Sequence, residues 1–206
     1  MKSIITALLL FVALSAHAAT PPAGLLEIQQ RWARIQYQLP EQERAAAFEQ
    51  LAQEAHALVE AHPQQAEPLI WQGIVLSTWA GAKGGLGALK LVKEARQSLE
   101  AALAIDETAL EGSAHTSLGS LYYQVPGWPL GFGDDKKAEH HLQKALGINP
   151  DGIDPNFFFG DFLLAQGKPE RARPYLDKAL KAPARPGREV ADTGRREEIR
   201  ARLDKL

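Results

Sequence analysis

The sequence predicts an all-α protein built from helical hairpins that stack side by side. The first observation behind this prediction is that apolar residues recur at spacings of three and four along most of the chain, which is the period of a helix with one buried face. The second is a pattern that occurs three times between residues 66 and 184: Gly-x-x and a large residue, followed later by Ala-x-x-x-Leu-x-x-Ala-Leu. Internal repetition of this kind indicates hairpins that bury their apolar faces on one another.

We expect the three repeats at about residues 66–108, 112–151 and 153–184. In each repeat a small residue of the first helix is matched by an alanine of the second, so that the two helices can approach closely. These pairs are Gly73 with Ala95, Gly119 with Ala138, and Gly160 with Ala172. The third pair has the spacing of a plain two-helix repeat, whereas the first two are wider by about ten and about seven residues, taking a regular repeat as reference. The first two hairpins are therefore predicted to carry insertions between their helices.

Capping helices are expected at both ends of the repeats. Residues 19–65 read as a pair of helices, because Leu25, Ile28 and Trp32 follow the helical period and Pro40 separates the two segments. Residues 185–206 read as a basic linker followed by a charged capping helix. Such terminal helices cover the apolar faces that the outermost repeats would otherwise expose to water.

The first 18 residues have the features of a secretory signal peptide. Lys2 is followed by an apolar stretch that is too short to cross a bilayer, and Ala16-His17-Ala18 is a typical cleavage site. We therefore expect cleavage after Ala18 and a periplasmic protein. The alternative interpretation is an uncleaved anchor or a buried first helix.

The composition excludes several functional classes. The 206 residues include 23 Lys and Arg, 25 Asp and Glu, and no Cys. A surface so nearly balanced in charge gives no support for nucleic-acid binding, which needs a basic face. The absence of Cys removes disulfides, thiol catalysis and Cys-ligated metals. No second segment is long and apolar enough to cross a membrane, so we expect no membrane span after cleavage of the signal peptide.

The two insertions differ in character. Residues 80–87 contain four glycines but do not match a phosphate-binding pattern, and no strand precedes them, so a flexible loop is expected before a helix at residues 88–105. Residues 125–135 combine Pro and Gly with Trp128, Leu130 and Phe132. These three side chains are too apolar to be left in solvent, so we expect them to pack on the helices or to line a pocket. Whether this loop is structural or part of a site stays open.

Polar residues near the second insertion raise the question of a metal site. Asp134 and Asp135 can cap the following helix, or they can be polar groups at a pocket or cation ligands. His115, His140 and His141 are further candidate ligands, but adjacent histidines on a helix point about 100° apart and no H-E-x-x-H pattern is present. We therefore expect no metal, no cofactor and no enzymatic activity. A metal-dependent hydrolase built on this region is the least favoured alternative.

The three repeats resemble the tetratricopeptide repeat (TPR) family over about residues 66–182. This resemblance implies a right-handed solenoid of helical hairpins, here with two inter-helix insertions and terminal capping helices. The insertions, the Gly-Asp-Asp at residues 133–135 and the predicted export are also similar to periplasmic TPR proteins associated with TRAP transporters.

The TPR resemblance implies a binding site on the concave face, lined mainly by the first helix of each repeat. The candidate binding residues on that face and in the second insertion are Ile74, Thr78, Thr116, Ser120, Tyr123, Gln124, Trp128, Phe132, Asp134, Asp135, Phe157 and Asp161. The lining lacks the Lys/Arg clamp with which TPR domains hold peptide carboxyl ends. We predict a periplasmic binding protein that holds a protein partner, a peptide or a small hydrophobic ligand. The alternative is an accessory ligand-binding component of a solute transport system.

Overall fold

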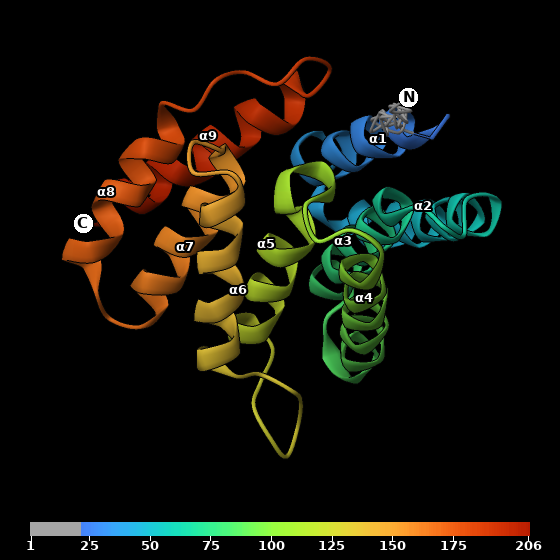
Figure 1. The fold of residues 1–206 in the computed structure, drawn as a ribbon, viewed down its shortest axis with the longest axis horizontal. Helices are drawn as coiled ribbons and strands as arrows, with labels where there is room; N and C mark the ends of the chain where they lie inside the picture. The colour runs from blue at the N-terminus through green and yellow to red at the C-terminus, as the bar shows by residue number, and fades with distance from the viewer. Residues whose placement is uncertain (1–21) are drawn as a thin grey trace, which may run out of the picture.

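A computed structural model describes residues 22–206, and in this range every regular element is a helix (Figure 1). The helices are α1 (Leu25–Gln38), α2 (Glu41–Ala61), α3 (Ala66–Lys83), α4 (Gly85–Ile105), α5 (Ala109–Gln124), α6 (Asp135–Ile148), α7 (Ile153–Ala165), α8 (Pro169–Leu180) and α9 (Glu189–Leu203). The prediction of an all-α protein is confirmed for these residues. The predicted signal peptide lies outside them. None of the described helices is both long enough and apolar enough to span a bilayer.

Successive helices pack as hairpins, and the hairpins pack on one another. The closest packing is within the pairs α3/α4, α5/α6 and α7/α8, and the first helices of neighbouring hairpins also contact one another. Helix α9 packs on α7 and α8 and also contacts α1, at the other end of the chain (Figure 1). The two ends of the curved row of helices therefore meet, and the inner helices surround a central space.

Close contact between the helices of each hairpin depends on the three repeated glycines. Each glycine faces a fully buried leucine of the partner helix. A Cβ atom built on the glycine would lie 2.6 Å from Leu99 Cγ at Gly73, 2.5 Å from Leu142 Cγ at Gly119, and 2.9 Å from Leu176 Cγ at Gly160. The leucine side chain occupies the space that a larger residue would need. The prediction that these glycines lie at helix-to-helix contacts is confirmed.

The first insertion is helical, which corrects the expectation of a loop. Helix α3 continues to Lys83 and α4 begins at Gly85, so that Gly84 alone separates them. Gly84 and Gly85 have φ angles of 62° and 65°, a conformation that glycine adopts without steric cost, and they reverse the chain at once. The remaining inserted residues include Ala, Leu and Lys, which favour helix, so the insertion lengthens both helices.

The second insertion is a compact loop held by its own backbone. Gly131 N–H donates to the Gly127 carbonyl (3.1 Å), and Gly133 N–H donates to that of Pro126 (3.0 Å). Val125 at the start of the loop is buried, and the Phe132 ring packs edge-on against that of Tyr122, with centroids 5.7 Å apart. These contacts keep the loop ordered without help from its tip.

The tip of this loop stands in solvent, which corrects a second expectation. The side chains of Trp128 and Leu130 are 90% and 68% exposed, so they neither pack on the helices nor line a pocket. In Figure 1 the loop between α5 and α6 projects beyond the ends of the helices. The expectation failed because the internal hydrogen bonds hold the loop away from the body.

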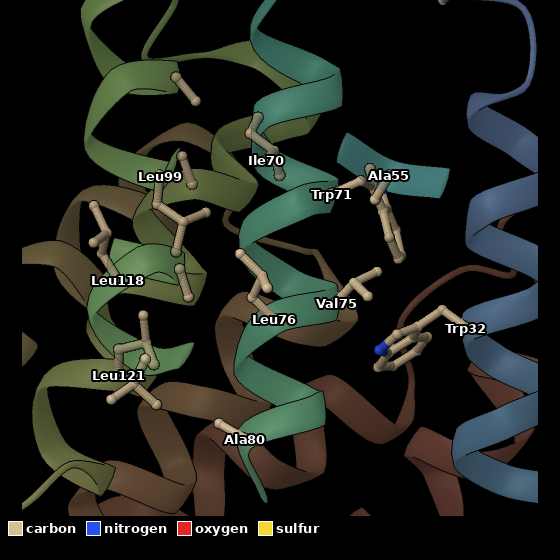
Figure 2. Close-up of a cluster of buried hydrophobic side chains, with 14 of the residues drawn as sticks. Trp32, Ala55, Ile70, Trp71, Val75, Leu76, Ala80, Leu99, Leu118 and Leu121 are labelled. Carbon is tan, nitrogen blue, oxygen red and sulfur yellow. The ribbon is translucent and has the colours of Figure 1, made fainter. Parts of the chain in front are cut away.

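The hydrophobic core runs through the row of hairpins. Figure 2 shows buried side chains from α1 to α5, among them Trp32, Trp71, Leu99 and Leu118. A second cluster lies between α7, α8 and α9 and consists of Ile153, Phe157, Leu176, Ala179, Ala182 and Ile199. Helix α9 thus covers the last hairpin, as a capping helix is expected to do.

Candidate ligand-binding cavity

A cavity of about 1070 Å³ lies inside the row of helices. Its wall is formed by the inner sides of α1, α3 and α5 and by the starts of α4 and α7. It is completed by the α6–α7 connection, by residues 183–186 with Arg188, and by α9. Ligand pockets in proteins usually measure about 300–1,000 Å³. The cavity is therefore large enough for an organic molecule or for a few residues of a peptide.

Part of the predicted concave face lines this cavity. Ile74 and Thr78 from α3 and Thr116, Ser120 and Gln124 from α5 lie on its wall. They come from the first helices of the first two repeats, as the repeat register implied. The Thr78 hydroxyl is held in place, because it accepts a hydrogen bond from the Trp32 indole (3.0 Å) and donates to the Ile74 carbonyl (2.8 Å).

The inner face of the third hairpin is covered by α9. The Arg195 guanidinium lies 4.4 Å from the centroid of the Phe157 ring, and Arg202 Nε donates to Asp161 (2.8 Å). The Tyr123 hydroxyl also donates to Asp161 (2.8 Å). Tyr123, Phe157 and Asp161, which we predicted on the concave face, therefore form the packing between α5, α7 and α9. They do not line the cavity.

The candidates in the second insertion also lie away from the cavity wall. The Asp134 carboxylate accepts hydrogen bonds from the backbone N–H groups of Lys136 (3.0 Å) and Lys137 (3.1 Å), so it is the N-cap of α6. Asp135 is in the first turn of the same helix. These positions favour the interpretation in which Asp134 and Asp135 stabilise the start of α6 over the one in which they belong to a pocket with Trp128 and Phe132.

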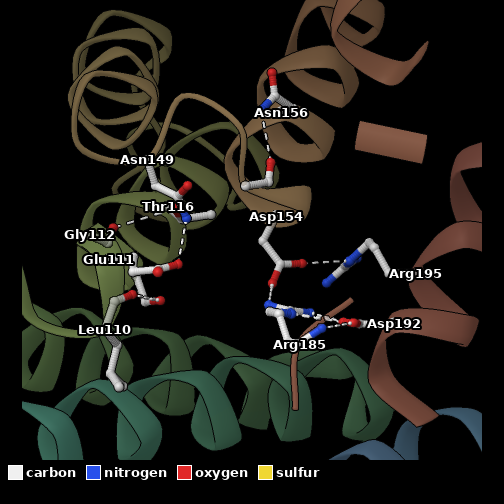
Figure 3. Close-up of polar contacts among 12 residues, drawn as sticks. Leu110, Glu111, Gly112, Thr116, Asn149, Asp154, Asn156, Arg185, Asp192 and Arg195 are labelled. Atoms are coloured by element: carbon white, nitrogen blue, oxygen red, sulfur yellow. Dashed lines mark hydrogen bonds and ion pairs between the residues drawn. The ribbon is translucent and has the colours of Figure 1, made fainter. Parts of the chain in front are cut away.

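A network of arginines and carboxylates joins α7 to the chain end beside the cavity (Figure 3). Asp154 accepts hydrogen bonds from Arg185 (2.7 Å) and Arg195 (2.9 Å), and Arg185 also donates to Asp192 (2.8 Å). Burial opposes the ionisation of Asp154, but the two guanidinium groups outweigh it and hold the pKa of this carboxyl far below its usual range. The network fixes residues 185–188, which the sequence presented only as a basic linker.

Aromatic rings from α1 and α3 form one corner of the cavity. The ring of Trp32 lies edge-on to that of Trp71 (centroids 5.8 Å apart) and to that of Tyr37 (5.9 Å). The Arg188 guanidinium lies over the Trp71 ring, 5.0 Å from its centroid. All four residues line the cavity, and none was among our candidates. The signal that could have pointed to them is the presence of tryptophans on both the N-terminal cap and the first repeat.

The start of α5 is strained where it reaches the cavity. Leu110 and Glu111 have φ angles of 48° and 56°, which are rare for residues other than glycine. The Glu111 carboxylate accepts a hydrogen bond from the Asn149 amide (2.8 Å), and both side chains line the cavity (Figure 3). Strained backbone of this kind is concentrated at binding sites, where surrounding contacts maintain it.

Two of the three histidines of the metal hypothesis, His115 and His141, pair with each other. His115 Nδ1 and His141 Nδ1 lie 2.9 Å apart, and the His141 ring stacks on Tyr122. Burial and the neighbouring His115 lower the pKa of His141 to about 4. Among residues 22–206, no cluster of three or more His, Asp or Glu side chains is arranged to hold a metal ion. The pair therefore contributes to the packing of α5 on α6.

No protein-family model matches this chain, and neither does any curated protein.

Proposed function

We propose that this chain is a binding protein that holds a ligand in its central cavity and carries out no chemistry on it. The observation that carries this proposal is the cavity of about 1070 Å³, whose wall combines hydroxyl and amide residues of α3 and α5 with aromatic residues of α1 and α3. Such a mixture of apolar surface and a few polar groups is typical of small-molecule sites. We further infer a TPR-like solenoid, which the three glycine–leucine contacts support.

The closure of the helix row favours a compact ligand. A groove that holds an extended peptide needs two open ends, whereas α9 meets α1 here. We therefore place a small molecule, or the end of a chain, in the cavity, ahead of a long peptide segment. Together with the predicted export, this also suits the alternative of an accessory component in solute transport.

The charged groups on the cavity wall support binding rather than catalysis. Asp154 is held by Arg185 and Arg195, and Glu198 also pairs with Arg195. A carboxylate engaged by two guanidinium groups is a weak base, so Asp154 is poorly suited to accept a proton from a substrate. These ion pairs shape the wall of the site.

The proposal can be tested by filling the cavity. N-phenyl-1-naphthylamine, an uncharged fluorescent probe, is titrated into the wild-type protein and into Ser120→Phe, whose new ring starts from the cavity wall of α5. The matched control is Ala57→Phe, which adds the same ring at an exposed position of α2. We expect saturable binding to the wild type and to the control, and an affinity at least about tenfold weaker in Ser120→Phe.

A wild-type protein that does not bind the probe, and that shows no co-purifying small molecule by native mass spectrometry, would overturn the proposal. Equal binding by Ser120→Phe and the control, with both variants folded, would show that the probe binds elsewhere and would count against this cavity.

A further inference from the structure

Arg188 differs from Arg185, Arg195 and Arg202 in having no acidic partner. Arg185 and Arg195 both pair with Asp154, and Arg202 pairs with Asp161. Among the described residues, the Arg188 side chain makes no ion pair, and its Nε is buried without a hydrogen-bond acceptor. The Arg188 guanidinium lies instead over the face of the Trp71 ring. A cation in this setting is poorly compensated.

The neighbouring carboxylates are already taken. Asp154 and Asp192 both bind Arg185, and Asp154 also binds Arg195. Burial, and after it the charge of Arg185, lowers the pKa of Arg188 from its ordinary value. A further negative group on the cavity side of Arg188 would offset both the burial of this cation and its repulsion by Arg185.

Tyr37 supplies a hydrogen-bond donor in the same corner. Its ring packs against α9 at Gly194, where a built Cβ atom would lie 2.3 Å from the ring, so glycine is needed there for the contact. Burial raises the pKa of Tyr37 above its ordinary value, so that the phenol keeps its proton at neutral pH. The residue lines the cavity, and its hydroxyl has no hydrogen-bond partner among residues 22–206.

We infer that the ligand of this cavity is an amphipathic organic anion with a flat apolar body. Its negative group lies at the Arg188 guanidinium and the Tyr37 hydroxyl, and its body lies against Trp32 and Trp71. The inference rests on the proposed function and assigns the chemical class of the ligand. A planar guanidinium matches the geometry of a carboxylate or sulfonate, and the small exposed parts of the two largely buried indole rings contribute to the apolar wall beside it.

The other charges on the wall are consistent with an anion at Arg188. The wall carboxylates other than Glu41 already have partners within the protein: Asp154 with Arg185 and Arg195, Glu198 with Arg195, Asp151 with Lys178, and Glu111 with Asn149. Glu41 is exposed at the start of α2. Arg44, the other wall arginine without an ion pair among the described residues, donates its Nε to the Leu39 carbonyl (2.9 Å), whereas the Nε of Arg188 has no acceptor. Arg188 is therefore the feature that selects the charge of the ligand.

Two probes that differ by one charged group test the inference. 8-Anilino-1-naphthalenesulfonate carries a sulfonate that N-phenyl-1-naphthylamine lacks. Both are titrated into the wild type, Arg188→Gln, Tyr37→Phe and the control Arg173→Gln, whose arginine is exposed on α8. We expect Arg188→Gln to bind the sulfonate probe at least about tenfold more weakly and Tyr37→Phe several-fold more weakly. Neither variant should bind the uncharged probe differently, and the control should match the wild type for both.

The outcomes separate the two proposals. If the wild type binds neither probe, the proposed function fails. If the uncharged probe binds but Arg188→Gln and Tyr37→Phe leave the affinity for the sulfonate probe unchanged, the inference on ligand charge fails alone. Thermal unfolding shows whether each variant is folded, and Tyr37→Phe, which removes one oxygen atom, still tests the inference if Arg188→Gln does not fold.

Discussion

Gly119→Ala tests the physical basis of the hairpins, because it adds one methyl group where α5 meets α6. The new Cβ would lie 2.5 Å from Leu142 Cγ and 3.2 Å from the Leu142 backbone nitrogen. Rotation of the leucine side chain can relieve the first contact but not the second. Overpacking of this kind lowers the free energy of unfolding by about 1–3 kcal/mol, and the better helix propensity of alanine offsets up to about 1 kcal/mol of that loss. We expect a net loss of about 1–2 kcal/mol in the free energy of unfolding.

The matched control is Gly147→Ala in the same hairpin. Gly147 lies in α6, and nothing comes within 4 Å of a Cβ atom built there, so the same substitution should gain stability by up to about 1 kcal/mol. Urea unfolding followed by circular dichroism measures both variants. In a thermal scan Gly119→Ala should lower Tm by about 2–8 °C.

A double-mutant cycle identifies the clash itself. Leu142→Ala alone should cost about 2–5 kcal/mol, because it empties a fully buried site. In the double variant the methyl group added in place of the Gly119 hydrogen no longer meets a leucine side chain, so the combined loss should be smaller than the sum of the two single losses. If Gly119→Ala is as stable as Gly147→Ala, or if the losses are additive, the close-approach explanation is wrong.

Two further predictions concern pH and helix capping. Because the pKa of His141 is about 4 in the folded chain and about 6.5 when unfolded, the unfolded state takes up its proton first as pH falls. The free energy of unfolding should therefore fall by about 1–2 kcal/mol between about pH 6.5 and pH 4, after allowing for the partial exposure of the ring. Urea titrations at several pH values should show a smaller loss for His141→Gln than for the wild type. Equal losses in the two proteins would contradict the prediction. Asp134→Ala removes the N-cap of α6 and should lower the free energy of unfolding in urea by about 1 kcal/mol. Asp135→Ala, which changes only the charge in the first turn, should lower it by less. Equal or reversed effects would show that the N-cap is not the main contribution of these two acids to stability.

The part of the site that could be predicted lies on two neighbouring helices. Ile74 and Thr78 on α3, and Thr116 and Ser120 on α5, line the cavity as the repeat register implied. Their positions depend on helical periodicity and on the packing of one hairpin against the next, and both leave a regular trace in the sequence.

The predictions failed where a segment packs on a distant part of the chain or on nothing. Residues 185–188 had the composition of a linker, yet they bring Arg185 and Arg188 to the cavity. Trp128 and Leu130 have apolar side chains of the kind that is usually buried, yet backbone hydrogen bonds within their loop hold them in solvent. The type of a side chain predicts whether burial is favourable for it, but not whether the fold brings another apolar surface close enough to cover it.

The sequence by itself determined the helices, their pairing within each hairpin and the small residues at the contacts, because these depend on neighbours that lie close along the chain. The tertiary structure alone decided that α9 would meet α1 and leave Arg188 beside Trp71. The physical reason is that these contacts join segments at opposite ends of the described chain. Such contacts leave no local pattern in the sequence.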